Sequence, residues 1–394
     1  MSDFHQRGLI STLPRLTSRS LDDMERQLEV FAKASPVALI LPCMLEDFRR
    51  PAMSDILQQV EKARYFSNIV VSLNLATATD LPEIRRALEG DARNVLLWND
   101  DPDLLALFPN VSRGKGFNLW TALGWLSHQG KCKVMVTHDA DILHYSREIP
   151  ALLALPLLDP DLGYRFVKGY YPRLSDKMGG QLYGRVTRLF VGPLLRALLR
   201  VEGHSPLLDF LDGFRYPLAG EFGGRLEDIA QFSLPAGWGL EMDLLCSVHR
   251  SLPPESVAQM DLGSNYEHKH QLITPGQSKA GLTRLASEIF SCLLHQLHRE
   301  GVQATPDFLQ ALRNAYLKSA RDTIRRYRHV ALLNRIDFHE DKEMLLVEEF
   351  SNVLHHPVAE CPVSLPSWSE LQRTKPDWCQ KFMEILQARN SLTS

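Results

Sequence analysis

The chain has 394 residues, of which 44% are hydrophobic and 23% are charged, with 23 glycines and 23 prolines. These proportions exclude collagen-like, fully disordered and disulfide-scaffold proteins, and the length suits roughly two to three domains. The 44 Lys and Arg residues face 47 Asp and Glu, which gives a net charge of −3. Because proteins that bind nucleic acid or anionic membranes normally carry excess positive charge, we expect neither partner.

The six cysteines are scattered and form no C-x-x-C pair. Cys43, Cys132, Cys246 and Cys292 lie in or beside apolar stretches and are expected to be small buried side chains. The start of the chain lacks the apolar core of a signal peptide, and no apolar run has the length of a membrane-spanning helix. We therefore expect a reduced, cytoplasmic protein.

Short β-branched runs alternate with helical patterns in the first part of the chain. The expected strands cover residues 37–41, 69–73, 94–98 and 133–137. The expected helices between them cover residues 53–66, 81–88 and 117–126. Continuous apolar strands alternating with amphipathic helices predict an α/β fold with a mostly parallel sheet covered on both faces. Ligands of such sheets bind at the carboxyl ends of the strands.

The pattern becomes mixed after about residue 160. We expect strands over 165–171 and 256–263, a helix over 184–199 interrupted at Pro193, and helices over 280–298, 307–327 and 340–354. The turn at residues 274–276 serves as a boundary. We therefore divide the chain into an N-terminal extension (1–34), the main domain (35–275) and a helical C-terminal region (276–394), whose apolar stripes would allow a homodimer.

Three Asp-x-Asp triplets occur. Those at 101–103 and 159–161 have a central proline and are expected to be polar turns. The third, Asp139-Ala140-Asp141, directly follows an apolar strand. Because residues i and i+2 of an extended segment point the same way, these two carboxylates are expected to converge where Mg²⁺ or Mn²⁺ could sit with a diphosphate. A solvated turn is the alternative.

Two further segments could bind anions. In Arg113-Gly114-Lys115-Gly116, glycine amides, a helix N-terminus and a lysine could face one, or the segment is a flexible turn. Residues 163–200 carry eight basic side chains against one acidic side chain, an imbalance that suits a small, strongly negative ligand. Within this stretch, Gly184-Arg185-Val186-Thr187 could offer a helix N-terminus, a guanidinium and a hydroxyl to one phosphate.

Imidazoles and carboxylates in the later loops complete the candidates. His268 and His270 follow the last predicted strand, and one of them could join Asp141 on a metal, although a solvated loop is the alternative. Glu221 follows a glycine that permits close approach of a ligand, so its carboxylate could orient a hydroxyl or take its proton. Glu221 and Glu241 are otherwise ordinary surface or capping residues.

Taken in order, these motifs resemble a family of retaining GT-A glycosyltransferases, the glucosyl-3-phosphoglycerate synthases. The resemblance covers roughly residues 35–275. It is carried by LPCMLED (41–47), GKG (114–116), DAD (139–141), FVKGYYPR (166–173), GRVTRLFVGPLL (184–195), PLAGEF (217–222), GWGLEMDLL (237–245) and EHKHQ (267–271). It implies a GT-A fold with a helical C-terminal extension.

The resemblance also implies an activity and a set of residue roles. The reaction would move glucose from a nucleoside diphosphate glucose, with UDP-glucose expected, to the 2-hydroxyl of 3-phosphoglycerate, with a divalent metal as cofactor. The nucleotide sugar would be bound by Pro42, Leu45, Glu46, Ser72, Lys115, Asp139 and Ala140. The acceptor would be bound by Gly184, Arg185 and Thr187. The metal would be bound by Asp139, Asp141 and His268. The catalytic residues would be Asp141, Glu221 and Arg185.

Departures from the family pattern leave the substrates open. The chain reads Leu45-Glu46-Asp47 where the family has an Asn-Glu pair, and residues 72–80 lack the usual acidic, glycine-rich turn. The donor could therefore carry another base or mannose, and the acceptor could be glycerate or another phosphorylated acid. A non-catalytic protein that binds nucleotide sugars is a further alternative.

Overall fold

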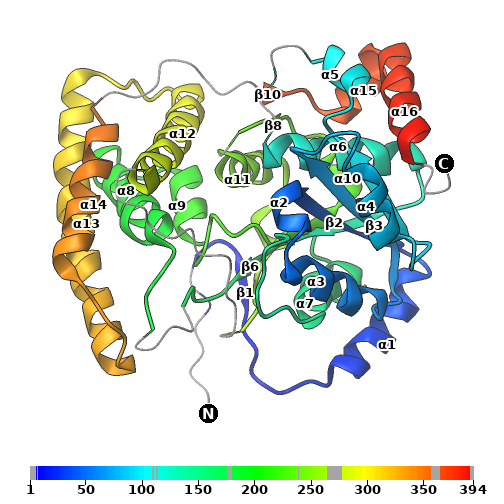
Figure 1. Cartoon of the computed structure of the whole chain (residues 1–394). Helices are drawn as coiled ribbons and strands as arrows, with labels where there is room; N and C mark the ends of the chain where they lie inside the picture. The colour runs from blue at the N-terminus through cyan, green and yellow to red at the C-terminus, as the bar shows by residue number, and fades with distance from the viewer. Residues whose placement is uncertain are drawn as a thin grey trace.

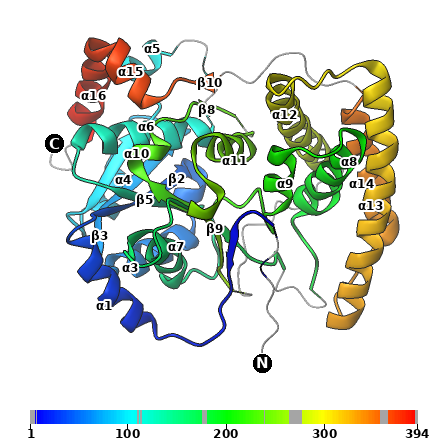
Figure 2. The same ribbon diagram turned by 180° about the vertical axis from the view of Figure 1, so that it is seen from behind.

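The computed structural model describes residues 6, 8–108, 111, 114–174, 180–237, 239–263, 277–355 and 364–390. A central sheet with helices on both faces forms one part of the protein, and a layer of helices lies beside it (Figures 1 and 2). Among these residues, no helix is long and apolar enough to cross a membrane.

The main sheet has eight strands in the order β1-β9-β6-β7-β5-β2-β3-β4. Only β7 is antiparallel to its neighbours, β5 and β6. The strands are β1 (Ser11–Leu13), β2 (Val37–Met44), β3 (Phe66–Asn74), β4 (Asn94–Trp98), β5 (Val134–Thr137), β6 (Phe166–Tyr170), β7 (Phe222–Arg225) and β9 (Val257–Asp261). A second, two-stranded sheet pairs β8 (Leu234–Pro235) with β10 (Ser364–Leu365).

The helices fall into those around the sheet and those of the adjacent layer. Around the sheet lie α1 (Leu21–Ala32), α2 (Leu45–Phe48), α3 (Pro51–Glu61), α4 (Leu81–Leu88), α5 (Pro102–Ala106), α6 (Lys115–Gln129), α7 (Glu148–Leu158), α10 (Leu226–Ile229), α15 (Trp368–Thr374) and α16 (Pro376–Asn390). The adjacent layer contains the π-helix η1 (Val186–Val191), α8 (Gly192–Val201), α9 (Pro206–Asp212), α12 (Gln277–Arg299), α13 (Pro306–Asn334) and α14 (Glu340–Val353). Between the two parts are α11 (Leu240–Ser251) and the 3₁₀ turn η2 (Pro254–Ser256).

All six predicted strands are present, as β2, β3, β4, β5, β6 and β9. Their apolar residues are buried because helices cover both faces of the sheet. The predicted turn at 159–161 is present, and the Asp159 carboxylate accepts a hydrogen bond from the Asp161 amide. The turn predicted at 101–103 is wrong, because Asp101 is the N-cap of α5, which begins at Pro102. The helix predicted over 184–199 forms as η1 followed by α8, with Pro193 in the first turn of α8.

Both ends of the chain pack on the main sheet. In the predicted N-terminal extension, β1 pairs with β9 and α1 packs on α7. In the predicted C-terminal region, β10 pairs with β8, and Trp368 stacks on Trp120 of α6 with ring centroids 4.3 Å apart. The division at residues 34 and 275 stays a prediction. Segments on both sides of each boundary contact one another.

The helical layer holds the segment that follows β6. Tyr316 of α13 donates a hydrogen bond to the Leu189 carbonyl of η1 at 2.8 Å. Phe190 of η1 packs against Tyr316 and against Phe350 of α14. The apolar stripes predicted in the C-terminal helices are thus used within the chain. Cys43, Cys132, Cys246, Cys292 and Cys379 are buried and free, which confirms the expectation for the first four.

Candidate active site

Asp139 and Asp141 lie in the loop after β5, which ends at Thr137. Ala140 between them is buried, and residues 140 and 141 form a turn, so the pair is carried by a turn and is not the extended segment that we predicted. Both aspartates are partly exposed. Burial raises the pKa of the Cys43 thiol, and the negative charges of Asp47 and Asp141 raise it further. Because Cys43 is the second-last residue of β2, Asp141 lies near the carboxyl end of that strand.

Lys115, the first residue of α6, forms ion pairs with Asp139 and with Glu241 of α11. Its Nζ lies 3.1 Å from Glu241 Oε1, and its side chain is 29% exposed. Burial opposes the charged ammonium, but Asp139, Glu241 and Glu221 outweigh that cost and raise the pKa of Lys115. A charged lysine therefore rests on Asp139 at the predicted metal position.

The glycines flanking Lys115 have a packing function. A Cβ on Gly114 would lie 2.8 Å from the Ala236 carbonyl oxygen, and one on Gly116 would overlap the Pro235 carbonyl. Close approach of the β8 segment therefore requires glycine at both positions. Arg113, the other cation predicted here, lies outside the described residues.

Gly220 lies directly against the Asp139 carboxylate. A Cβ at this position would be 2.6 Å and 2.7 Å from the two carboxylate oxygens and would also meet Lys115 Nζ. The antiparallel pairing of β7 with β5, which places Phe222 opposite Thr137, brings Gly220 to this point. The group that approaches Gly220 in the structure is the Asp139 carboxylate, and the predicted approach of a ligand stays a prediction.

Glu221 is fully buried, and its predicted contact with an acceptor hydroxyl stays a prediction. Its Oε2 accepts a hydrogen bond of 2.7 Å from the Tyr171 hydroxyl. Lys168 of β6 is also fully buried, and its Nζ donates to the Ala219 carbonyl at 2.5 Å. Burial lowers the pKa of Lys168 to about 8, against the opposing effect of Glu241 and Glu221. The 219–221 segment is therefore held by two hydrogen bonds, from Lys168 to the Ala219 carbonyl and from Tyr171 to the Glu221 carboxylate.

Ser72 has no exposed surface. Its hydroxyl donates to the Asn118 carbonyl at 2.8 Å and accepts from the Asn99 amide at 2.9 Å. The Asn118 amide donates in turn to the carbonyls of Ser72 and Cys43. These bonds tie α6 to the carboxyl ends of β2 and β3, and the predicted contact of Ser72 with the uridine stays a prediction.

The remaining predicted nucleotide contacts lie at the end of β2. Pro42 is buried opposite Ser72, whereas Leu45 and Glu46 begin α2, where Leu45 is partly exposed and Glu46 is exposed. Glu46 forms an ion pair with Arg50 and remains 69% exposed at its side chain. Leu45 and Glu46 are therefore accessible at the carboxyl edge of the sheet, as a nucleotide contact requires, and their roles stay a prediction.

The predicted acceptor segment begins beside the last residues of FVKGYYPR. Gly184 has φ +70°, a left-handed conformation that favours glycine, and a Cβ there would lie 3.8 Å from Cδ of Arg173. The Tyr183 amide donates to the Arg173 carbonyl at 2.9 Å. Arg185 and Thr187 follow, both partly exposed, at the start of η1.

The two halves of the predicted site are connected. Arg173 contacts the Tyr216 hydroxyl at 3.4 Å, and the ring of Tyr216 packs edge-on against Tyr171, which binds Glu221. Next to Glu221 in the chain, Gly220 touches Asp139. An unbroken series of contacts therefore runs from the aspartates to the segment that holds Arg185.

The donor set suits a divalent cation. Asp139 and Asp141 offer carboxylate oxygens, the ligands that Mg²⁺ and Mn²⁺ prefer, and a lysine ammonium already occupies one of them. His268, the predicted third ligand, and His270 lie outside the described residues. Within the described part of the chain, no group of three His, Cys, Asp or Glu side chains is arranged to hold a metal.

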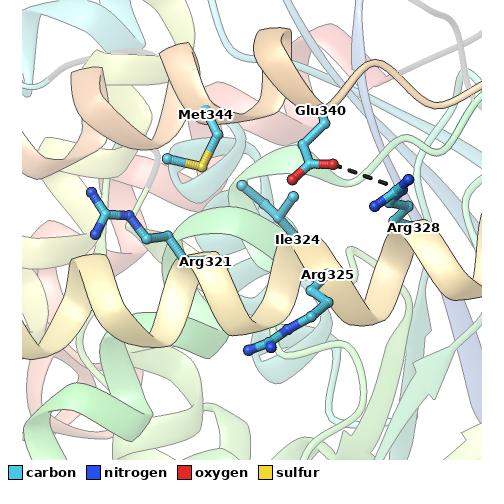
Figure 3. A pocket seen from close by; sticks show the side chains of 6 residues that line it. All are labelled: Arg321, Ile324, Arg325, Arg328, Glu340 and Met344. Atoms are coloured by element: carbon cyan, nitrogen blue, oxygen red, sulfur yellow. Dashed lines mark ion pairs between the residues drawn. The ribbon is translucent and has the colours of Figure 1, made fainter.

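A cavity of about 330 Å³ lies between α13 and α14, lined by Arg321, Ile324, Arg325, Arg328, Glu340 and Met344 (Figure 3). None of the predicted site residues lines it. Its three guanidinium groups point in different directions, and Arg328 turns toward Glu340. The cavity does not present converging charges to a ligand.

Sequence reasoning missed the residues that support the site. A lysine and an arginine at the two ends of KGYYPR (168–173) were counted only toward a basic excess. A lysine in the middle of an apolar strand was the available signal, because such a lysine is buried only with partners. Asn118 had no comparable signal, since helix α6 was expected to be simply amphipathic.

Comparison with solved structures gives the class. A crystal structure of glucosyl-3-phosphoglycerate synthase from Mycobacterium tuberculosis, in complex with Mn²⁺, UDP-glucose and phosphoglyceric acid, superimposes with a TM-score of 0.54 at 23% identity. The match covers 73% of this chain and 87% of that one. Mannosyl-3-phosphoglycerate synthase from Rubrobacter xylanophilus gives a TM-score of 0.54 at 21% identity, over 71% and 84% of the two chains. The fold is that of a GT-A glycosyltransferase.

Comparison with curated proteins gives the family. A glucosyl-3-phosphoglycerate synthase from Persephonella marina is 33% identical over 406 aligned residues, which cover 99% of this chain and 100% of that protein. One from Methanococcoides burtonii is 29% identical over 383 residues, or 92% of each chain. No family model matches the chain. The chain belongs to the glucosyl-3-phosphoglycerate synthase family and is a glycosyltransferase.

Proposed function

We propose that the protein transfers glucose from UDP-glucose to the 2-hydroxyl of 3-phosphoglycerate with retention of the anomeric configuration. Family membership supports this reaction, and one related crystal structure contains Mn²⁺, UDP-glucose and phosphoglyceric acid. The single observation that carries the proposal is the connected series of contacts from Asp139 to Arg185. It provides one region with carboxylates for a metal and a diphosphate, and with guanidinium groups for an anionic acceptor.

The residues of this chain divide the work between donor and acceptor. Asp139 and Asp141 would hold a divalent ion, which when bound neutralises charge on the departing diphosphate. Lys115 would then turn from Asp139 toward the nucleotide while keeping its ion pair with Glu241. Arg185 and Thr187 would bind the phosphate of the acceptor.

Retention is then simplest as an attack from the same face as the leaving group. The acceptor oxygen forms the new bond to the anomeric carbon as the bond to the diphosphate breaks, and the departing phosphate oxygen takes the hydroxyl proton. The burial of Glu221 supports this course over a covalent intermediate, because a nucleophilic carboxylate has to reach the anomeric carbon.

A panel of donors and acceptors tests the proposal. UDP-, GDP- and ADP-glucose and GDP-mannose are combined with 3-phosphoglycerate and with glycerate, with and without Mg²⁺ or Mn²⁺, and the released nucleotide is measured. We expect metal-dependent release with UDP-glucose and 3-phosphoglycerate, and its near-complete loss in Asp141→Ala. Metal-dependent turnover that survives in Asp141→Ala would refute the metal assignment, and sugar binding without any product would favour the non-catalytic alternative.

We also propose a homodimer. Leu332 and Leu333 at the end of α13 are 66% and 85% exposed, and Val330 nearby is 44% exposed. These three exposed apolar side chains near the end of α13 form the surface that we propose for contact with a second copy. Analytical ultracentrifugation of the whole chain and of Leu332→Glu tests it: the parent should sediment as a dimer and the variant as a monomer. A monomeric parent would refute the proposal.

A further inference from the structure

Arg173 and Arg185 are two neighbouring cations that lack a carboxylate partner among the described residues. By contrast, Arg188 is paired with Glu343 at 2.9 Å, and Arg165 is paired with Asp228 at 2.9 Å. The hydrogen bond found for the Arg173 guanidinium is its 3.4 Å contact with the Tyr216 hydroxyl. A partly buried guanidinium that is not neutralised by the protein is suited to an anionic ligand.

The backbone fixes these two arginines side by side. Leu174 and Leu182 form an antiparallel bridge, and the Tyr183 amide donates to the Arg173 carbonyl. The Arg173 side chain therefore lies over Gly184, the residue before Arg185. The two guanidinium groups reach the same region from different segments of the chain.

The electrostatics at Arg185 favour an anion. Burial, together with the positive charges of Arg188 and Arg173, lowers the pKa of Arg185, although Glu343 acts in the opposite direction. Like charges held together away from water are unfavourable unless an opposite charge joins them. A ligand with two anionic groups would relieve this repulsion at Arg185. At Arg173 burial opposes the charge, but Tyr216, Tyr171 and Glu221 outweigh it, raise the pKa and keep the guanidinium charged.

The two arginines differ in their position relative to the donor half of the site. Arg173 lies on the side of Tyr216, Tyr171 and Glu221, and Arg185 lies farther along the series of contacts from Asp139. In 3-phosphoglycerate the carboxylate is attached to the carbon that carries the reacting 2-hydroxyl, whereas the phosphate is one carbon and one oxygen farther away. The group nearer the donor is therefore the carboxylate.

We propose that Arg173 determines acceptor specificity by binding the carboxylate of a phosphorylated 2-hydroxy acid while Arg185 binds its phosphate. This inference rests on the proposed function and adds a residue that recognises the acid group. Arg173 would thereby distinguish 3-phosphoglycerate from glycerol 3-phosphate, which has the same phosphate and 2-hydroxyl but no carboxylate.

The test compares these two acceptors on Arg173→Met and Arg173→Lys. Loss of a charge-assisted hydrogen bond should lower kcat/KM for 3-phosphoglycerate about 10- to 100-fold in Arg173→Met. For glycerol 3-phosphate the same variant should stay within about 3-fold of the parent protein, because the lost interaction was never made. Arg173→Lys, which keeps the charge but not the planar fork, should lose less and only with 3-phosphoglycerate.

Two variants serve as controls. Arg215 also lies over a tyrosine ring, at 5.3 Å from the centroid of Tyr170, but it is exposed. Arg215→Met should leave both acceptors unchanged. Arg185→Met should weaken both acceptors equally, because both carry the phosphate. Calorimetric binding of each acceptor in the presence of UDP provides a readout that does not depend on turnover.

The outcomes separate this inference from the proposed function. Equal losses with both acceptors in Arg173→Met, or no loss with either, would overturn the role of Arg173 while leaving glucosyl transfer intact. If the parent protein neither binds nor glucosylates 3-phosphoglycerate, the proposed function itself fails. Thermal unfolding of each variant shows whether an equal loss reflects a damaged fold, in which case the result of Arg173→Lys decides.

Discussion

Gly220→Ala is the substitution that tests the site most directly. A methyl group at residue 220 would lie 2.6 Å and 2.7 Å from the two oxygens of the Asp139 carboxylate. Lys115 can swing away, because it meets the methyl group only with the end of a flexible side chain. Asp139 is short and follows directly on β5, so its carboxylate must retreat by about 0.8 Å to reach ordinary van der Waals contact. Gly220 is not in the left-handed region, so alanine adds no backbone strain.

The displacement sets the magnitude. Misplacing a catalytic group by about 1 Å can cost about 100-fold in rate, or about 2.7 kcal/mol of transition-state stabilisation. We therefore expect kcat/KM for glucosyl transfer to fall about 100-fold in Gly220→Ala, with a higher metal concentration needed for half-maximal activity. Nucleotide release at graded Mn²⁺ concentrations measures both quantities, and calorimetric titration with Mn²⁺ and UDP measures binding without turnover.

Gly90→Ala is the matched control. Gly90 is exposed after α4, and a Cβ there meets no atom within 4 Å, so activity should be unchanged. If Gly220→Ala keeps kcat/KM within about 3-fold of the parent and binds Mn²⁺ equally well, the close approach of residue 220 to Asp139 has no role in the site, and the reasoning fails.

Three further predictions concern stability. Trp368→Ala should lower the free energy of unfolding by about 3–5 kcal/mol in urea titrations, because the side chain is 1% exposed; a loss below about 1 kcal/mol would contradict its packing role. Glu343→Gln should cost about 3–5 kcal/mol by leaving Arg188 buried without its partner, whereas Asp322→Asn, which removes an exposed ion pair, should cost at most about 1 kcal/mol; equal costs would be evidence against this. Lys168, whose pKa is lowered to about 8, loses its proton in the folded state before the unfolded chain does, so stability should rise with pH from about 8 toward the ordinary lysine pKa of 10.5, and Lys168→Met should lack that rise.

The sheet could be predicted from the sequence because its strands carry their own signal. The run NVLLW is apolar after its first residue, and it coincides with β4 from its first residue to its last. β1 and β7 carry no such signal. β1 has only three residues. β7 contains two glycines, which allow Leu157 and Ile229 to pack closely against the strand. Only the tertiary structure reveals that advantage.

The site could be predicted in part. The motifs predict that Asp139, Lys115 and Arg185 lie near one edge of the sheet, because each follows a strand or precedes a helix, and the structure brings Lys115 against Asp139. A motif does not reveal whether a side chain faces outward. Ser72 and Glu221 are at the expected places in the chain, but both are fully buried by partners from distant segments. Exposure depends on those partners, and a single sequence does not specify them.

Two glycines of helix α6 are packed so closely by neighbouring groups that neither position has room for a methyl group. Gly116 is closed by the Pro235 carbonyl, and Gly124 is closed by the indole of Trp368. A shift or rotation of α6 would therefore cause steric clashes, so the position of Lys115 at its N-terminus is fixed. Trp368, which is far along the chain from the predicted site, thus helps to set the position of Lys115.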